Sequence, residues 1–137
     1  MAHGKAKLDD IDALAMALPE VTHGGAWGGR HAYAVKGKGF VLWRGPRKDA
    51  VDEQTGELLE DVIVFMTPTQ EDKEALLQSG PPWFTTPHFD GYDAVLLRER
   101  HLPQVTRAEL EEVICDAWLR RAPKRLARQW LAEHRPL

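Results

Sequence analysis

The chain has 137 residues, with 18 Lys and Arg against 21 Asp and Glu and a formal net charge of −3. This length fits one domain, residues 1–137, which can bury enough surface to fold without disulfides or a structural metal. The slight acidity argues against wholesale binding of nucleic acid, and no apolar window is long enough to cross a membrane. The charge is nevertheless uneven: acids outnumber bases over residues 44–74, and bases predominate over residues 98–137.

The cysteine and the first residues indicate a cytoplasmic protein. The single cysteine, Cys115, cannot form an internal disulfide, and it lies in a helical run where a buried structural thiol is expected. The first twenty residues contain aspartates and no unbroken apolar stretch. They therefore predict a flexible tail over residues 1–7 and then a helix, rather than a signal peptide.

The first half of the chain predicts one helix, two strands and a loop. Apolar residues recur at three- and four-residue spacing over residues 8–18, and Pro19 ends this helix. Around "KGKG", β-branched and aromatic residues favour two antiparallel strands, about 30–36 and 39–44. The polar stretch 45–60 is expected to form a long hairpin loop that faces solvent.

The second half predicts two further strands separated by a helix. "DVIVFM", residues 61–66, and "AVLLRE", residues 94–99, have the composition of strands. The helix between them is expected to have Thr67 as its cap, Pro68 in its first turn and Gly80 after its end.

The last third of the chain is helical. Thr106 and Glu109 have the spacing of a capping box, and the apolar stripe that follows includes Trp118. A proline then interrupts the pattern, and a short helix over residues 123–134 carries Trp130 on its apolar side. Both tryptophans are expected to be buried. The order of elements predicts an α+β domain with a mainly antiparallel sheet backed by helices.

Three patches of sequence combine into one pattern: "ALPEVT" (17–22), "FTTPHFDGYDAVLL" (84–97) and "AWLRRAPKRL" (117–126). Together they resemble the MmcQ/YjbR family of small bacterial proteins, and the likeness runs from about residue 8 to residue 133. The resemblance implies a fold of the CyaY-like or double-wing type and a family name that includes DNA-binding. It brings no agreed catalytic residues and no cofactor. The polar stretch 45–60 looks longer than the connection usual in the family.

The aromatic stretch "PPWFTTPHFDGYDAV", residues 81–95, is expected to be a structural corner. Asp90 and Gly91 form a strong turn signal, because glycine reaches positive φ without strain. The functional alternative sets His88, Asp90, Tyr92 and Asp93 around a pocket, with the histidine as a general base oriented by a carboxylate, although no nucleophile with an oxyanion-stabilising motif accompanies it. An open cavity lined by Trp83, Phe84, His88 and Tyr92 would instead indicate a ligand pocket of a small-ligand or protein-interaction module.

Spacing predicts neither a metal site nor a nucleotide cofactor. The six histidines never pair at one-, three- or four-residue spacing, and the cysteine has no partner. Neither "KGKG" nor "GGAWGG" has the phosphate-loop or dinucleotide pattern, so both are expected to be turns. Trp27, between two glycine pairs, is either packed over a sheet edge or an exposed stacking platform.

Bases gather near the C-terminus in "RRAPKRLARQWL". On a helical projection Lys124, Arg125 and Arg128 share one side, opposite Leu126 and Trp130. This side is either an ordinary solvated face or a patch that contacts nucleic-acid phosphates. The candidate nucleic-acid-binding residues are Arg120, Arg121, Lys124, Arg125 and Arg128, joined by Lys36 and Lys38 at the hairpin tip.

These observations predict a non-enzymatic cytoplasmic protein that binds DNA phosphates weakly and without sequence preference. Contacts from Lys and Arg to phosphates position a protein without reading bases. The alternative is a protein-interaction or small-ligand module that uses the aromatic stretch 83–92. No cofactor, metal or membrane partner is expected.

Overall fold

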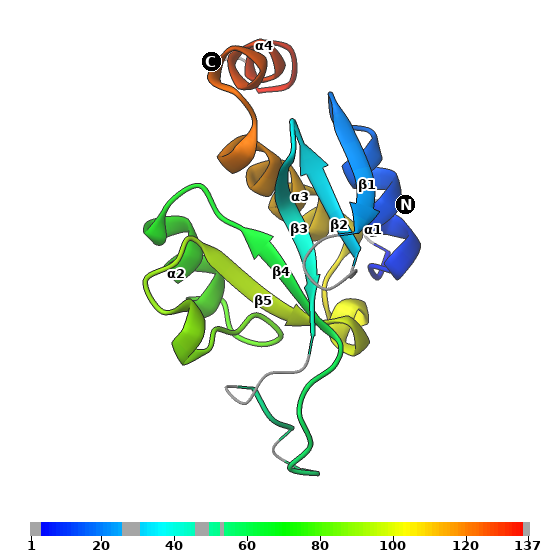
Figure 1. The fold of residues 1–137 in the computed structure, drawn as a ribbon, viewed down its shortest axis with the longest axis vertical. Helices are drawn as coiled ribbons and strands as arrows, with labels where there is room; N and C mark the ends of the chain where they lie inside the picture. Colours follow the sequence, from blue (N-terminus) through cyan, green and yellow to red (C-terminus); the bar gives the residue numbers. More distant parts are fainter. Residues whose placement is uncertain (1–3, 26–30, 46–49, 53, 136–137) are drawn as a thin grey trace.

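We describe a computed structural model of the protein over residues 4–25, 31–45, 50–52 and 54–135. The elements run from an N-terminal helix through five strands to a C-terminal helical pair (Figure 1). In chain order they are α1 (Leu8–Met16), β1 (Val21–Gly25), β2 (His31–Val35), β3 (Lys38–Arg44), β4 (Val62–Met66), α2 (Gln70–Gln78), the 3₁₀ helix η2 (Pro87–Phe89), β5 (Ala94–Arg98), the 3₁₀ helix η3 (Glu99–Gln104), α3 (Arg107–Arg121) and α4 (Lys124–His134).

The five strands form one sheet in the order β1-β2-β3-β4-β5, and each strand is antiparallel to its neighbours. The α+β class with an antiparallel sheet backed by helices is therefore confirmed. Strand β1 was missing from the sequence-based prediction, because "VTHGG" is rich in glycine and polar residues, which strands disfavour. Pairing with β2 decides its conformation, with Val21 opposite Val35. Trp27 lies outside the described residues.

The hairpin predicted around "KGKG" is confirmed. Lys36 and Gly37 both have positive φ, 50° and 82°, which is the conformation of a tight two-residue turn between antiparallel strands. The register shifts between Tyr33 and Ala34, opposite the start of β3. This hairpin tip lies at the same end of the molecule as α4 (Figure 1).

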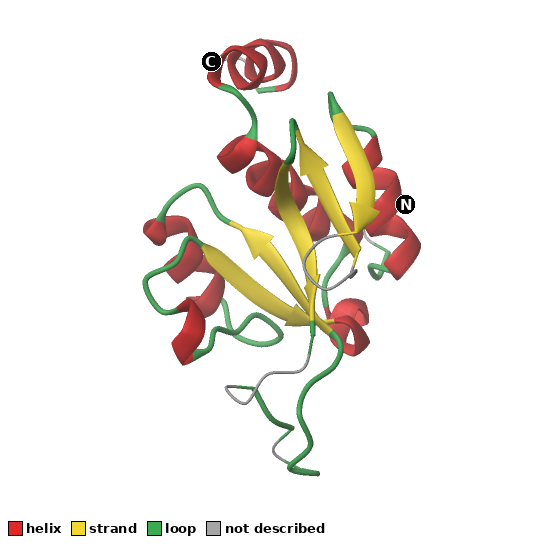
Figure 2. Ribbon diagram, in the orientation of Figure 1, coloured by secondary structure: helices red, strands yellow, loops and turns green. Residues whose placement is uncertain are grey.

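Helices α1 and α3 cover one face of the sheet (Figure 2). Val41 and Phe65 are paired across the strands of this core and are fully buried. Trp118 of α3 is also fully buried, and its indole N–H donates to the carbonyl of Pro19 at 3.1 Å. The burial of Trp118 predicted from the apolar stripe is confirmed, and so is that of Trp130, which is 7% exposed.

Helix α2 begins two residues later than predicted. Thr69, rather than Thr67, is the N-cap, and its hydroxyl accepts a hydrogen bond from the backbone N–H of Asp72 at 3.1 Å. Thr67 is buried at the end of β4, and its hydroxyl donates to the carbonyl of Thr69. The prediction of Thr67 was wrong because Thr69 has the same capping chemistry and is followed three residues later by an acidic side chain. Gly80 ends the helix at a φ of 95°, as predicted.

Residues 4–7 are ordered by pairing rather than forming part of a tail. The backbone N–H of Ala6 donates to the carbonyl of Val105, and that of Arg107 donates to the carbonyl of Gly4, both at 2.8 Å. Ala6 is 1% exposed. The segment is therefore tied to the start of α3, a long-range contact that no local pattern indicates.

Most of the described residues of the stretch 45–60 are exposed, as predicted for a loop that faces solvent, but two of them are buried. Ala50 and Leu59 are buried, and the N–H of Leu59 donates to the carbonyl of Ala50 at 3.0 Å. The carboxylate of Asp52 accepts a hydrogen bond from Arg98 of β5 at 2.9 Å, and this contact lowers the pKa of Asp52. Ala50 and Leu59 therefore anchor this stretch to the protein, whereas Val51 and Leu58 remain exposed.

Candidate nucleic-acid interface and neighbouring pockets

Helix α4 presents bases on one side and apolar residues on the other. Lys124, Arg125 and Arg128 are exposed, whereas Leu126 is half-buried and Trp130 is buried. We call these three bases the α4 basic face. Within the described residues, none of the three forms a hydrogen bond or ion pair with another side chain. The projection predicted from the sequence is confirmed, and the charges of this face are open to solvent.

Helix α4 is fixed to α3 by contacts in and just past its C-terminal half. The rings of Trp130 and Trp118 lie with centroids 5.6 Å apart. Arg135, just past the helix, donates to Asp116 at 2.9 Å and lies over the Trp130 ring at 5.5 Å. The aromatic contact and the ion pair together hold α4 in one orientation, so its basic face points away from the core.

The first turn of α4 concentrates positive potential. Lys124 and Arg125 occupy this turn, which contains no acidic residue. The N-terminal end of a helix already carries a partial positive charge, and cations there are unfavourable for helix stability. These two bases therefore do not complement the dipole of α4, whereas Arg120 and Arg121 do complement that of α3 in its last turn. Bases at the start of a helix make a surface that attracts anions.

The other four candidate bases are not part of the α4 basic face. Arg120 forms an ion pair with Asp93 at 3.3 Å, and Lys36 forms one with Glu20 at 3.8 Å. Arg121 donates to the hydroxyl of Tyr92 at 3.1 Å. Lys38, in contrast, is exposed at the start of β3. The structure thus divides the predicted set into the three exposed bases of the α4 basic face, three bases with partners within the protein, and the exposed Lys38.

The aromatic stretch 81–95 forms a corner held by α2. Gly91 has a φ of 79°, as predicted. Lys73 of α2 is 2% exposed, and its ammonium donates to the carbonyls of Phe89 and Tyr92 at 2.6 and 2.8 Å. Burial lowers the pKa of Lys73. The sequence analysis did not predict that Lys73 is buried. The three-residue spacing from Lys73 to Leu76 places both on one side of the helix and could have indicated this burial.

The four residues of the alternative pocket do not line one cavity. Trp83 lines a cavity between α2 and α3, whereas Tyr92 lines another at the ends of β3 and β4. Phe84 pairs with Leu96 in a single bridge beside β5. The backbone of His88 belongs to η2, and its side chain lies outside the described part of the structure.

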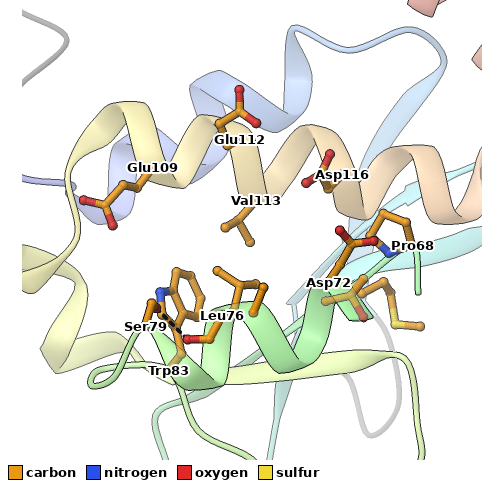
Figure 3. Close-up of a pocket in the computed structure, with 12 residues that line it drawn as sticks. Pro68, Asp72, Leu76, Ser79, Trp83, Glu109, Glu112, Val113 and Asp116 are labelled. Atoms are coloured by element: carbon orange, nitrogen blue, oxygen red, sulfur yellow. Dashed lines mark hydrogen bonds between the residues drawn. The ribbon is translucent and has the colours of Figure 1, made fainter. Parts of the chain in front are cut away.

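The cavity between α2 and α3 has a volume of about 370 Å³ and an acidic rim. Figure 3 shows Leu76 and Val113 facing each other across it, with Trp83 below. Asp72 and Glu109 accept capping hydrogen bonds at the starts of their helices, and Asp116 pairs with Arg135. The carboxylates at this rim therefore have structural partners.

A cluster of aromatic side chains, separate from the two cavities, lies on β1, β2 and β3. The rings of His23 and Tyr33 stack with centroids 4.4 Å apart, and Nε2 of His23 lies 3.3 Å from Nδ1 of His31. Burial and a hydrogen bond to Asp12 raise the pKa of Tyr33 well above its ordinary value. The spacing of His23 and His31 along the chain could not predict that they lie together, because the pairing of β1 with β2 brings them close. Within the described residues, no three His, Cys, Asp or Glu side chains are placed to hold a metal ion.

The fold and these surfaces define a small α+β protein whose five-stranded antiparallel meander carries a docked, basic C-terminal helix. The YjbR family profile matches residues 16–120. The chain is 35% identical over 130 residues to "Uncharacterized protein Mb2600" of Mycobacterium bovis and to "Uncharacterized protein Rv2570" of Mycobacterium tuberculosis. Each alignment covers 90% of this chain and 95% of the relative. No solved structure matches significantly. The chain belongs to the YjbR family, as its sequence patches predicted.

Within the described residues, no helix is long and apolar enough to cross a membrane.

Proposed function

We propose that this YjbR-family protein is a non-enzymatic cytoplasmic protein that binds nucleic-acid phosphates weakly through the α4 basic face. One observation carries the proposal: Lys124, Arg125 and Arg128 are exposed on a single side of α4 and have no acidic partner within the described residues. A surface charge with no protein partner is free to replace counterions at a phosphate backbone.

The expected affinity is weak and does not depend on sequence. Three bases contact about three phosphates, and each phosphate contributes about 0.9 to the slope of log K against log salt concentration for duplex DNA. Lysine and arginine contacts of this kind fix position on the backbone and carry no sequence information. The net charge of −3 opposes close approach of other faces, which favours contact at this end of the molecule.

The protonation state of the Cys115 thiol supports the non-enzymatic part of the proposal. Burial raises the pKa of Cys115 to about 11, so the sulfur is protonated at neutral pH. A protonated thiol is a poor nucleophile. Lys73 is likewise occupied by two backbone carbonyls.

The test compares two double variants that remove the same charge. Lys124→Gln with Arg128→Gln neutralises the α4 basic face, and Lys5→Gln with Arg100→Gln neutralises two exposed bases distant from α4. Fluorescence anisotropy with two unrelated duplexes at about 50 mM salt should show weaker binding for the first variant on both duplexes. Binding by the second variant should match the wild type. Equal binding by wild type and both variants would contradict the proposal.

A further inference from the structure

A pocket at the ends of β3 and β4 combines an apolar floor with positive charge. It has a volume of about 260 Å³. Its floor consists of buried side chains, and its rim of polar or charged ones. The floor is formed by Leu42, Val64, Met66 and Phe89, and the rim by Lys38, Tyr92 and Arg121.

Arg121 is half-buried at this pocket, and no carboxylate of the described residues forms an ion pair with it. Its Nη2 donates to the hydroxyl of Tyr92 at 3.1 Å and lies 3.9 Å from the sulfur of Met66. Its Nε is buried and has no hydrogen-bond partner within the described residues. A guanidinium has five N–H donors, so most of its capacity is unused here. A partly buried cation without a counter-ion is unfavourable unless an anion reaches it.

The adjacent Arg120 differs from Arg121, because Arg120 has a carboxylate partner. Arg120 is more exposed and forms an ion pair with Asp93 at 3.3 Å. Among the residues that the structure describes, no Asp or Glu lines the pocket, and its second charged group, Lys38, is also a base. The pocket is thus electropositive at its rim although the protein as a whole is acidic.

The floor decides what kind of anion fits. Leu42 is 6% exposed, and Val64 and Met66 are each 2% exposed, so a ligand would reach these side chains through a cavity rather than from the open surface. Gly39 lines the same wall, and a Cβ at this position would lie 2.7 Å from Cδ2 of Leu42. The glycine therefore leaves the Leu42 side chain in its place beside the cavity. Small-molecule sites characteristically combine apolar walls with a few polar groups that fix orientation.

We propose that this pocket binds a small organic carboxylate, with the carboxylate at Arg121 and Lys38 and an apolar body against Leu42, Val64 and Met66. Arginine binds carboxylates through paired N–H donors, which the unpartnered Nε and the remaining guanidinium nitrogens can supply. The tyrosine hydroxyl, which accepts from Arg121, keeps its own proton to donate to the same carboxylate. Inorganic phosphate would reach the two bases and leave the apolar floor uncovered. The proposal does not depend on nucleic-acid binding, because Arg121 is not part of the α4 basic face.

The experiment is an NMR titration of the full chain with phenylacetate, isovalerate and octanoate. Phenylacetamide is the uncharged comparison. Inorganic phosphate is the comparison that has charge but no apolar body to cover the floor of the pocket. At least one carboxylate should shift amides of β3, β4 and the 89–92 corner, with a Kd on the order of 1–10 mM for so small a ligand. Phenylacetamide and phosphate should bind at least about tenfold more weakly.

Matched variants assign the binding to the proposed groups. Arg121→Gln should weaken carboxylate binding by about tenfold or more, and Lys38→Gln, an exposed change that leaves packing intact, by a few-fold. Arg120→Gln removes the same charge one residue away and should bind as the wild type does. The amide spectrum of each free variant reports whether it is folded. Absence of shifts with all three carboxylates, equal binding of phenylacetamide, or unchanged binding in both Arg121→Gln and Lys38→Gln would overturn the proposal.

Discussion

The rings of Trp118 and Trp130 lie with centroids 5.6 Å apart and their planes inclined at 54°. This contact joins α4 to the core on the far side of the break at Pro123, so the two helices behave as one packed unit. Trp118 is fully buried and Trp130 packs against it, so the opposite side of α4, which carries Lys124, Arg125 and Arg128, is the exposed one. The orientation of the α4 basic face therefore depends on a hydrophobic contact rather than on its own charges.

Truncation of Trp118 should be among the most destabilising single changes in the protein. Trp118→Ala removes a fully buried ring that packs under α4 and should cost ~3 to 5 kcal/mol of unfolding free energy. Urea unfolding measures this loss, with Met16→Ala, which changes an exposed side chain of α1, as the control. A loss below about 1 kcal/mol for Trp118→Ala would show that the ring is not part of the core.

Gly91→Ala should be destabilising through backbone strain alone. Gly91 has a φ of 79°, and a Cβ there would have no heavy atom within 4 Å, so no clash contributes. The expected loss of unfolding free energy is on the order of 1 kcal/mol. Gly24→Ala is the matched control, because its Cβ would also meet open space but its φ is not positive. Equal effects of the two substitutions would contradict the strain argument.

Lys73→Met should loosen the corner at 89–92. The substitution keeps a long apolar side chain but removes the two hydrogen bonds from the ammonium to the carbonyls of Phe89 and Tyr92, each of which still accepts one backbone N–H. A hydrogen bond from a charged donor contributes about 1.5 to 3 kcal/mol, so the substitution should lower the unfolding free energy, and amide exchange should accelerate in the corner before it does so in the sheet. Gln78→Met, an exposed change in the same helix, should leave both stability and exchange nearly unchanged. Wild-type exchange in Lys73→Met would show that the two hydrogen bonds do not hold the corner.

The thiol of Cys115 should make stability fall at high pH. Burial raises its pKa from 9.0 to about 11 in the folded protein, so the folded state keeps the proton over a range where the unfolded state loses it. The stabilising contribution is complete below about pH 9 and is lost as the pH rises towards 11. Urea unfolding of wild type and Cys115→Ala at pH 8, 9 and 10 isolates this contribution. Parallel pH profiles for the two proteins would contradict the shift.

Local signals predicted most of the fold, and long-range pairing accounts for the rest. The capping box of Thr106 and Glu109 lies within one turn, so the sequence alone locates the start of α3. Strand β1 has weak strand propensity and exists because β2 offers an edge to pair with. The same limit applies to residues 4–7, whose partners are about a hundred positions away.

The basic region was predicted only in part, because some of its contacts join residues that are far apart in the sequence. The helical projection separated the α4 basic face from Trp130, because both depend only on the period of one helix. It could not show that Arg121 reaches Tyr92, 29 residues earlier, or that Arg120 pairs with Asp93. Charge composition located the basic region, and only the fold shows which of its charges have partners within the protein.

The salt dependence of DNA binding tests the proposed function most directly. The account predicts that log K for two unrelated duplexes falls linearly with log salt concentration, with a slope of about −3 for three neutralised phosphates. Lys124→Gln with Arg128→Gln should reduce that slope to about −1 on both duplexes, with little change in unfolding free energy because solvated surface charges contribute at most about 1 kcal/mol. No detectable binding at about 50 mM salt, or an unchanged slope in the double variant, would contradict the assignment of the α4 basic face to nucleic-acid phosphates.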